Sequence, residues 1–91
     1  MHNTGYYQAV RTEVVRLLQA ERKRKGLSNY AVSQLSGVSE ATLSRIDSLG
    51  RAPSFEVMLR MADAVGADFS VLIKKAQKAA EKTTGPVKKN R

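Results

Sequence analysis

The chain has 91 residues, of which 42% are apolar, and its 16 basic and 8 acidic side chains give a formal charge of +8. This length suits one domain with one modest core and leaves no room for a separate catalytic domain. The sequence has no cysteine and a single histidine, His2, which excludes disulfides, thiolate zinc sites and most metal clusters. We therefore expect neither a bound metal nor a cofactor.

The positive charge is concentrated at the two ends of the chain. Residues 1–26 carry six basic and two acidic side chains, and residues 67–91 carry seven and two, whereas residues 27–66 carry three basic and four acidic ones. This balance favours a polyanionic partner that is attracted mainly by the flanks. No apolar run approaches the roughly 20 residues of a membrane span and no signal peptide is evident, so we expect a cytoplasmic protein without a membrane partner.

A long first helix is predicted over residues 4–25, a segment without proline. Its apolar residues recur at the three-and-four spacing of one helix face, namely Tyr6, Val10, Val14, Leu17 and Leu18. The cations of residues 22–25 suit a helix C-terminus, and Gly26 can adopt the left-handed conformation that ends a helix.

Two short helices are predicted next. Ser28 is a good N-cap for a helix that Gly37 ends after about two turns, and Ser39 is a second N-cap. In the third predicted helix, Leu43 and Ile46 are spaced to bury one side.

Two further helices follow a loop at residues 48–53. Ser54 can cap the fourth helix and Gly66 can end it, while Asp68 or Ser70 can cap the fifth, whose pattern stops beyond Lys82. The expected buried faces are Phe55, Met58, Met61, Ala62 and Val65 in the fourth helix and Phe69, Leu72, Ile73 and Ala76 in the fifth. Residues 87–91 are predicted to form a disordered basic tail. Because no strand signal is present, the predicted fold class is all-α.

Two short capped helices joined by a tight turn form a helix-turn-helix, whose second helix can enter a DNA major groove. The apolar residues expected to lock the angle between the two helices are Val32, Leu35, Val38, Leu43 and Ile46. The outer face of residues 40–48 is then free to contact base edges.

The same stretch resembles a known family. The segments that carry the resemblance are Gly26-Leu27-Ser28, Ser33, Gly37-Val38-Ser39, Leu43-Ser44-Arg45-Ile46-Asp47, Pro53-Ser54 and Met61-Ala62. They are similar to the helix-turn-helix family of Cro and phage repressors, also called XRE-like, over residues 12–73. The resemblance implies a compact five-helix bundle of the lambda-repressor-like type that binds DNA as a dimer. Residues 1–11 would then extend the first helix, and residues 74–91 would form the basic end of the fifth helix and the tail.

The resemblance also implies which residues contact DNA. The residues matching base-reading positions are Glu40, Ala41, Ser44 and Arg45, and those matching positions at the phosphate backbone are Ser28, Asn29, Ser39, Thr42, Ser48 and Arg51. Arg45 is the principal candidate because a guanidinium can bond guanine O6 and N7 together. Glu40 could accept a hydrogen bond from cytosine N4, and Ala41 could touch a thymine methyl group.

Several of these residues also have a purely structural interpretation. The serines that start the helices can act only as N-caps, and Glu40 is favoured by the helix dipole whether or not DNA is present. Arg45 could pair with Asp47 instead of a base. The cations of residues 22–25 could be a solvated helix end or a further DNA contact.

The apolar stripe of the first helix begins before the region of resemblance. Because uncovered apolar patches usually mark interfaces, we expect a homodimer contact formed by Tyr6, Tyr7, Val10, Val14, Leu72 and Ile73, together with Ala76. The alternative is that the stripe packs on the chain's own fifth helix.

The leading functional interpretation is a sequence-specific dimeric regulator, expected to be a repressor, that acts by occupying double-stranded DNA. One alternative is the antitoxin of a toxin–antitoxin pair, which would bind both DNA and a toxin-like protein partner. Another is a nonspecific DNA coater that relies on the basic ends. An enzyme is not expected, because the carboxylates are scattered and no cysteine or histidine lies beside Ser28 or Ser39 to activate a nucleophile.

Overall fold

The computed structural model describes residues 4–48 and 52–84, and within them every regular element is a helix. The helices are α1 (Thr4–Arg24), α2 (Asn29–Ser36), α3 (Glu40–Asp47), α4 (Phe55–Val65) and α5 (Phe69–Thr84). The predicted all-α fold with five helices is therefore confirmed. The predicted basic tail at residues 87–91, Arg51 and part of the loop before α4 lie outside the described residues.

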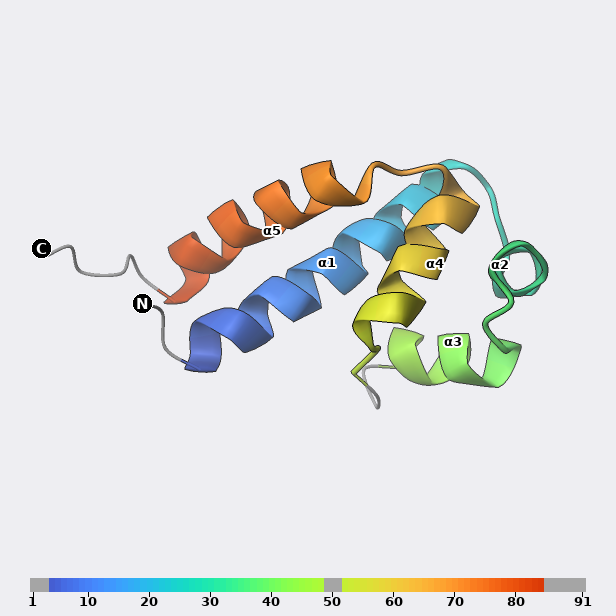
Figure 1. Cartoon of the computed structure of the whole chain (residues 1–91), viewed down its shortest axis with the longest axis horizontal. Helices are drawn as coiled ribbons and strands as arrows, with labels where there is room; N and C mark the ends of the chain where they lie inside the picture. The colour runs from blue at the N-terminus through green and yellow to red at the C-terminus, as the bar shows by residue number, and fades with distance from the viewer. Residues whose placement is uncertain (1–3, 49–51, 85–91) are drawn as a thin grey trace, which may run out of the picture.

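The helices form two parts of one bundle (Figure 1). The long helices α1 and α5 lie side by side, with the start of α1 and the end of α5 at the same end of the molecule. The shorter helices α2, α3 and α4 gather around the other end of α1. This arrangement places the helix-turn-helix away from the free end of the α1–α5 pair.

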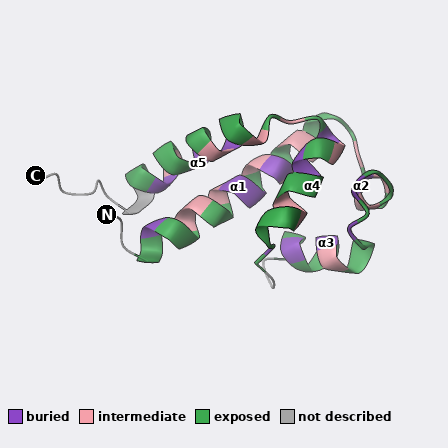
Figure 2. Cartoon of the chain, in the orientation of Figure 1, coloured by how far each residue is buried: buried purple, intermediate pink, exposed green. Residues whose placement is uncertain are grey.

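The core joins the two parts. Figure 2 shows the buried residues in purple along the helices. The core cluster consists of Val14, Val15, Leu18, Val32, Val38, Leu43, Ile46, Met61, Ala62, Val65, Leu72 and Ala76. Members from α1, α2, α3 and α4 are therefore packed in one continuous interior. The orientation of α3 depends on this shared core, because a close-packed interior leaves side chains little room to shift.

The predicted capping residues are confirmed at three helix starts. The hydroxyl oxygens of Ser28, Ser39 and Ser54 accept hydrogen bonds from the backbone N–H groups three residues ahead, at 3.0, 3.1 and 3.1 Å. Gly37 ends α2 and Gly66 ends α4, both in the left-handed conformation at φ values of 78° and 70°. Short helices of about two turns are marginal by themselves, so these caps help to fix where α2 and α3 begin and end.

Two residues predicted to be buried are exposed instead. Leu35 was expected to lock the helix crossing, but its exposed fraction is 63%. Val32 and Ser36 lie on the buried side of α2. Successive helix residues point about 100° apart, so Leu35, directly before Ser36, points away from that side. Phe55, expected in the buried face of α4, is 65% exposed and packs edge-on with the Phe69 ring, with the ring centroids 5.6 Å apart.

The predicted dimer stripe is largely covered by the chain's own fifth helix. Tyr6 and Val14 in α1 and Leu72 in α5 are buried where these two helices pack together, and Ala76 lies in the same interior. These buried residues pack within the chain itself, as the alternative expects, and the homodimer contact stays a prediction. Val10 and Ile73 are half-buried, and Tyr7 remains exposed. Among the described residues, no helix is both long and apolar enough to cross a membrane.

Asp68 caps the start of α5. Its Oδ1 accepts hydrogen bonds from the hydroxyl and the backbone N–H of Ser70, at 2.7 and 3.0 Å, and from the N–H of Val71 at 3.4 Å. The Ser70 hydroxyl contributes most, followed by the Val71 N–H, and together they hold the pKa of the Asp68 carboxyl below its ordinary value.

We therefore expect the Asp68 cap to stabilise the fold above the ordinary aspartate pKa and to lose this effect as pH falls through the lowered folded-state pKa. Carboxyl NMR titration should place the Asp68 midpoint below that of an unfolded peptide. The stability advantage of the wild type over Asp68→Asn should shrink on acidification. An Asp68 midpoint at or above the peptide value would contradict this account.

Candidate nucleic-acid interface

The turn between α2 and α3 is fixed by local backbone geometry. Gly37 adopts the left-handed conformation, which side chains disfavour, and its N–H donates to the Ser33 carbonyl oxygen at 2.9 Å. The buried hydroxyl of Ser36 accepts a hydrogen bond from the Val38 N–H at 3.0 Å, and the Val38 side chain is buried. The turn thereby sends α3 across α2 in a set direction.

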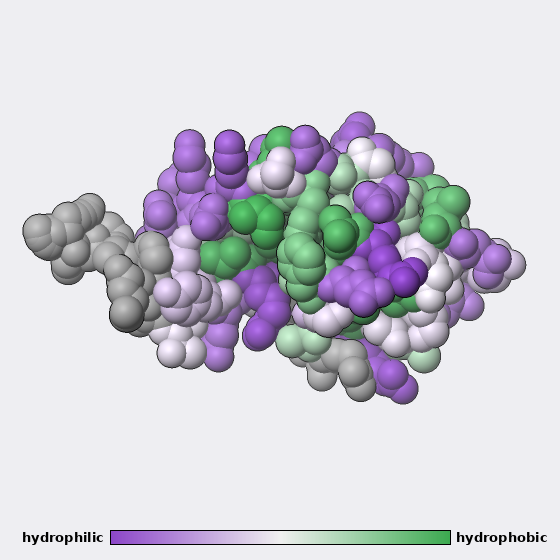
Figure 3. Space-filling view, in the orientation of Figure 1, coloured by the Kyte–Doolittle hydropathy of each residue, from purple (hydrophilic) through white to green (hydrophobic). Residues whose placement is uncertain are grey.

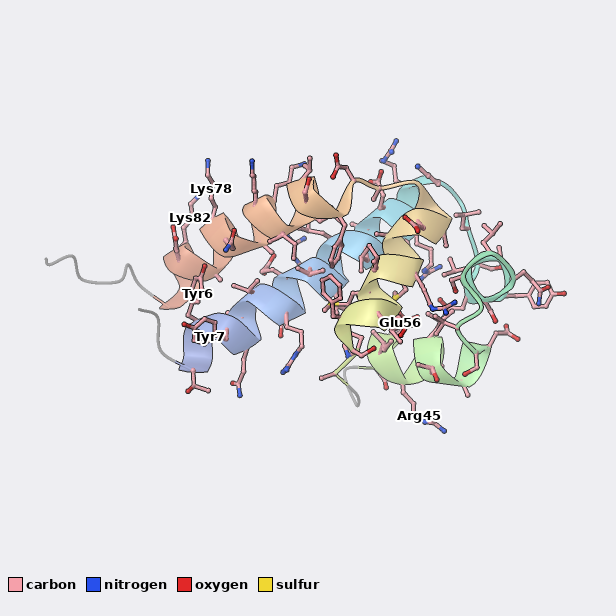
Figure 4. All side chains as sticks on the ribbon, viewed as in Figure 1. Tyr6, Tyr7, Arg45, Glu56, Lys78 and Lys82 are labelled. Carbon is pink, nitrogen blue, oxygen red and sulfur yellow. The ribbon has the colours of Figure 1, made fainter. Side chains whose placement is uncertain are left out.

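The outer side of α3 is exposed and largely unoccupied. We call its four predicted base-reading residues the reading face: Glu40, Ala41, Ser44 and Arg45, all of which are exposed. The Arg45 side chain makes no hydrogen bond or ion pair within residues 4–48 and 52–84. It points away from the rest of the molecule (Figure 4). The opposite side of α3 buries Leu43 and Ile46 in the core.

The predicted phosphate-binding residues lie mostly at helix ends. Ser28 and Ser39 are the N-caps of α2 and α3, and the hydroxyl of Ser39 also donates to that of Thr42 at 2.9 Å. The Ser48 hydroxyl donates to the Arg45 carbonyl oxygen at 3.1 Å. The first N–H groups of α2 and α3 have no intrahelical acceptor, which makes both helix starts suitable for an anion.

Asp47 connects three helices, which the sequence analysis did not predict. Its carboxylate accepts hydrogen bonds from Gln19 Nε2 in α1 at 2.6 Å and from Asn29 Nδ2 in α2 at 2.8 Å, and Arg22 Nη2 lies 4.0 Å away. We call these four side chains the Asp47 junction. The alternative that Arg45 pairs with Asp47 is not what the structure shows. The Asn29 amide group, predicted to bind phosphate, is also engaged here.

The cations at the end of α1 are mostly bound within the chain. The Arg22 side chain is 17% exposed and donates through Nη1 to the Leu27 carbonyl oxygen at 2.7 Å, while its buried Nε has no partner among the described residues. Arg24 bonds Glu21 at 2.6 Å, and Lys25 Nζ bonds the Val65 carbonyl oxygen. The Arg22 and Lys25 contacts hold α1 against the following loop and α4, and all three favour the structural interpretation of this segment.

Arg60 of α4 contacts the end of α2, directly before the α2–α3 turn. Its Nη1 donates to the Ser36 carbonyl oxygen at 3.0 Å, and its Nε donates to Glu56 at 3.0 Å. A cation at the C-terminus of α2 is favourable because the last carbonyl groups of a helix carry partial negative charge. Arg60 lies 24 positions from Ser36, so no local sequence pattern indicated this contact.

Asp47→Ala is expected to lower the free energy of unfolding by about 1–2 kcal/mol, because hydrogen bonds to a charged group are lost and Arg22 loses its nearest carboxylate. Denaturant unfolding measures the change. Asp63→Ala is the matched control, since Asp63 lies in the last turn of α4, is exposed and has no side-chain partner among the described residues. Both changes remove an acid that opposes the helix dipole, so equal effects would contradict a role for the Asp47 junction.

Comparison with known proteins gives a family match. A model of the helix-turn-helix domain matches residues 13–72, which is well over half of the chain and includes every helix of the turn region. No curated protein and no solved structure gives a significant match. Together with the five helices and the capped α2–turn–α3 unit, this match shows that the chain belongs to the helix-turn-helix domain family of DNA-binding proteins.

Proposed function

We propose that the chain is a sequence-specific transcription regulator that reads DNA bases with the reading face of α3. The observation that carries this proposal is the state of Arg45, whose guanidinium is exposed and unpaired within the described residues while the other side of α3 is fixed in the core. Because the core already fixes the backbone of α3, binding a base has to order the Arg45 side chain but not the helix that carries it.

Each residue of the reading face has a chemical role in this proposal. Arg45 donates to guanine O6 and N7, Glu40 accepts from cytosine N4, and Ala41 contacts a thymine methyl group. Ser44, one turn from Glu40 on the same side, can bond several bases and adds little specificity by itself. The chain acts by occupying its site, as a repressor would.

Phosphate contacts would place α3 in the groove. The free N–H groups at the starts of α2 and α3 bind phosphate oxygens beside Ser28 and Ser39. Thr42, in the first turn of α3, and Ser48, its C-cap, would add hydroxyl contacts to phosphate. Asn29 contributes through its backbone N–H, since its side-chain amide already bonds Asp47. Arg51, which follows α3 in the sequence, completes this proposed set.

A dimer would use a surface different from the predicted stripe. Phe55 and Leu59, four residues apart on α4, are exposed, and Phe55 contacts the half-buried Phe69. In Figure 3, hydrophobic residues gather over α1 and α5 beside α4. The first turn of α4 lies near the end of α3 in Figure 1, so a twofold contact here would bring two copies of α3 onto one side of the dimer.

One of the observations that favoured the antitoxin alternative no longer does so. It drew on the apolar stripe of α1 as a surface for a toxin-like partner, and α5 covers much of that stripe. A small protein that co-purifies stoichiometrically with the chain would nevertheless favour it over the regulator.

Selection from random duplex DNA at physiological salt tests the proposed function. We expect enrichment of an inverted repeat whose half-site centres lie about 10 base pairs apart, because two copies of α3 would enter successive major grooves about 34 Å apart. Enrichment of no sequence would contradict base reading by this protein. Sedimentation of the chain with and without Phe55→Ser tests the dimer separately, and a dimer that the substitution leaves intact would exclude the α4 contact.

A further inference from the structure

Four lysines form the outer side of α5, and we call them the lysine face: Lys74, Lys75, Lys78 and Lys82. All four are exposed. With about 3.6 residues per turn, they fall on the side of α5 opposite to the buried alanines at positions 76 and 80. Lys74, Lys78 and Lys82 follow each other at intervals of four residues, each a rise of about 6 Å, which gives a row of positive charges along the helix.

The chain neutralises this row only in part, through the exposed Glu81 three residues after Lys78. None of the four ammonium groups forms a salt bridge or hydrogen bond in the part of the chain that the structure describes. Lys74 lies near Asp68 and Lys75 near Glu21, but these acids are already engaged. The pKa of Glu21 is lowered mainly by its hydrogen bond with Arg24, with a smaller contribution from Lys75. Repulsion along the row therefore favours an external anion.

The lysine face points away from the reading face. In Figure 4, Lys78 and Lys82 extend from one side of the molecule and Arg45 extends from the opposite side. α1 and α4 lie between α5 and α3 in Figure 1. A straight duplex bound to α3 therefore cannot also reach the outer side of α5.

We propose that the lysine face binds the phosphate backbone of a second DNA segment, so that the chain joins two duplexes. This inference rests on the proposed function, which supplies the first duplex at α3. Lysines bind phosphates as compact point charges without reading sequence, as a second, unrelated segment requires. A membrane surface suits the face less well, because the apolar side of α5 is buried against α1 and cannot enter lipid.

The test uses the full chain and two duplexes that carry different dyes, one with the selected sequence and one with a scrambled sequence. The selected duplex is first bound in a stoichiometric complex, and the scrambled duplex is then added at physiological salt. We expect the two dyes to co-sediment, with an apparent Kd for the scrambled duplex of about 10⁻⁴–10⁻⁶ M. The double variant Lys78→Gln, Lys82→Gln should weaken this second binding by about tenfold and reduce its salt slope by about 2.

A charge-matched control separates the lysine face from net charge. The double variant Arg11→Gln, Lys23→Gln removes two exposed cations of α1 that do not belong to the lysine face. It should keep the second binding within about twofold of the wild type, because salt screens exposed charges that do not themselves contact phosphate. Equal losses in both double variants, or no co-sedimentation with the wild type, would overturn the inference. So would lysine-dependent binding to vesicles containing anionic lipid in place of the second duplex. If the proposed function fails, the earlier selection from random DNA enriches no sequence. If only the lysine face fails, a sequence is enriched but the second duplex does not bind.

Discussion

Leu43→Ala is expected to lower the free energy of unfolding by about 2–5 kcal/mol, the usual range for a leucine truncated in a packed core. Leu43 is 1% exposed and is among the largest fully buried side chains of the described structure. Its removal leaves a cavity between α3 and the helices that hold it. A small domain has a total stability of only about 5–15 kcal/mol, so a large part of the population should unfold on mild heating.

The matched control is Leu35→Ala, the same change in the neighbouring helix. Leu35 was predicted to be buried, but it is 63% exposed, so its truncation should change stability by no more than about 0.5 kcal/mol. Denaturant unfolding of both variants measures the difference. Similar losses for the two leucines would mean that α2 and α3 pack differently from the arrangement described above.

Arg45→Ala is expected to weaken binding to the selected duplex by about 5- to 150-fold for each half-site, which corresponds to about 1–3 kcal/mol for a bidentate contact to guanine. The melting temperature should stay the same, because Arg45 has no partner within the described residues. Affinity for a scrambled duplex should fall much less, since phosphate contacts do not depend on sequence.

Arg11→Ala provides the control for this loss of charge. Arg11 is exposed on α1, outside the reading face, and its removal should lower the affinity for selected and scrambled duplexes by a similar, small factor. If Arg45→Ala behaves in the same way, Arg45 binds phosphate and the base contact assigned to it is wrong.

The helix boundaries could be predicted because local chemistry sets them. A serine hydroxyl that accepts an N–H three residues ahead and a glycine that adopts a left-handed conformation act within one turn of the chain, as seen at Ser39 and Gly37. The apolar spacing of α1 and α5 likewise predicted which sides are buried. These are properties of a few neighbouring residues, and no distant contact is needed to produce them.

What covers an apolar side could not be predicted in the same way. The spacing of Tyr6 and Val14 indicated an apolar stripe. The same spacing is expected whether α5 or a second copy of the chain covers the stripe. In the two-turn helix α2, Leu35 and Val32 were both consistent with one buried side, and only the direction of packing places Leu35 outside.

The Asp47 junction depends on contacts that are distant in sequence. Gln19 and Asn29 lie 28 and 18 positions before Asp47, so no local pattern joins them. One signal was nevertheless present, since an acidic residue at the end of α3 opposes the helix dipole and needs partners that compensate. The reading face itself could be proposed from sequence because its residues lie on one short helix, and the structure describes them as exposed.

The most direct test of base reading by α3 is to repeat the selection from random duplex DNA with Arg45→Ala beside the wild type. We predict that the wild type enriches an inverted repeat and that the variant loses its preference at one position, mirrored in both half-sites, while the other positions are kept. Identical enriched sequences for the two proteins, or none for either, would contradict the claim that Arg45 on α3 reads DNA.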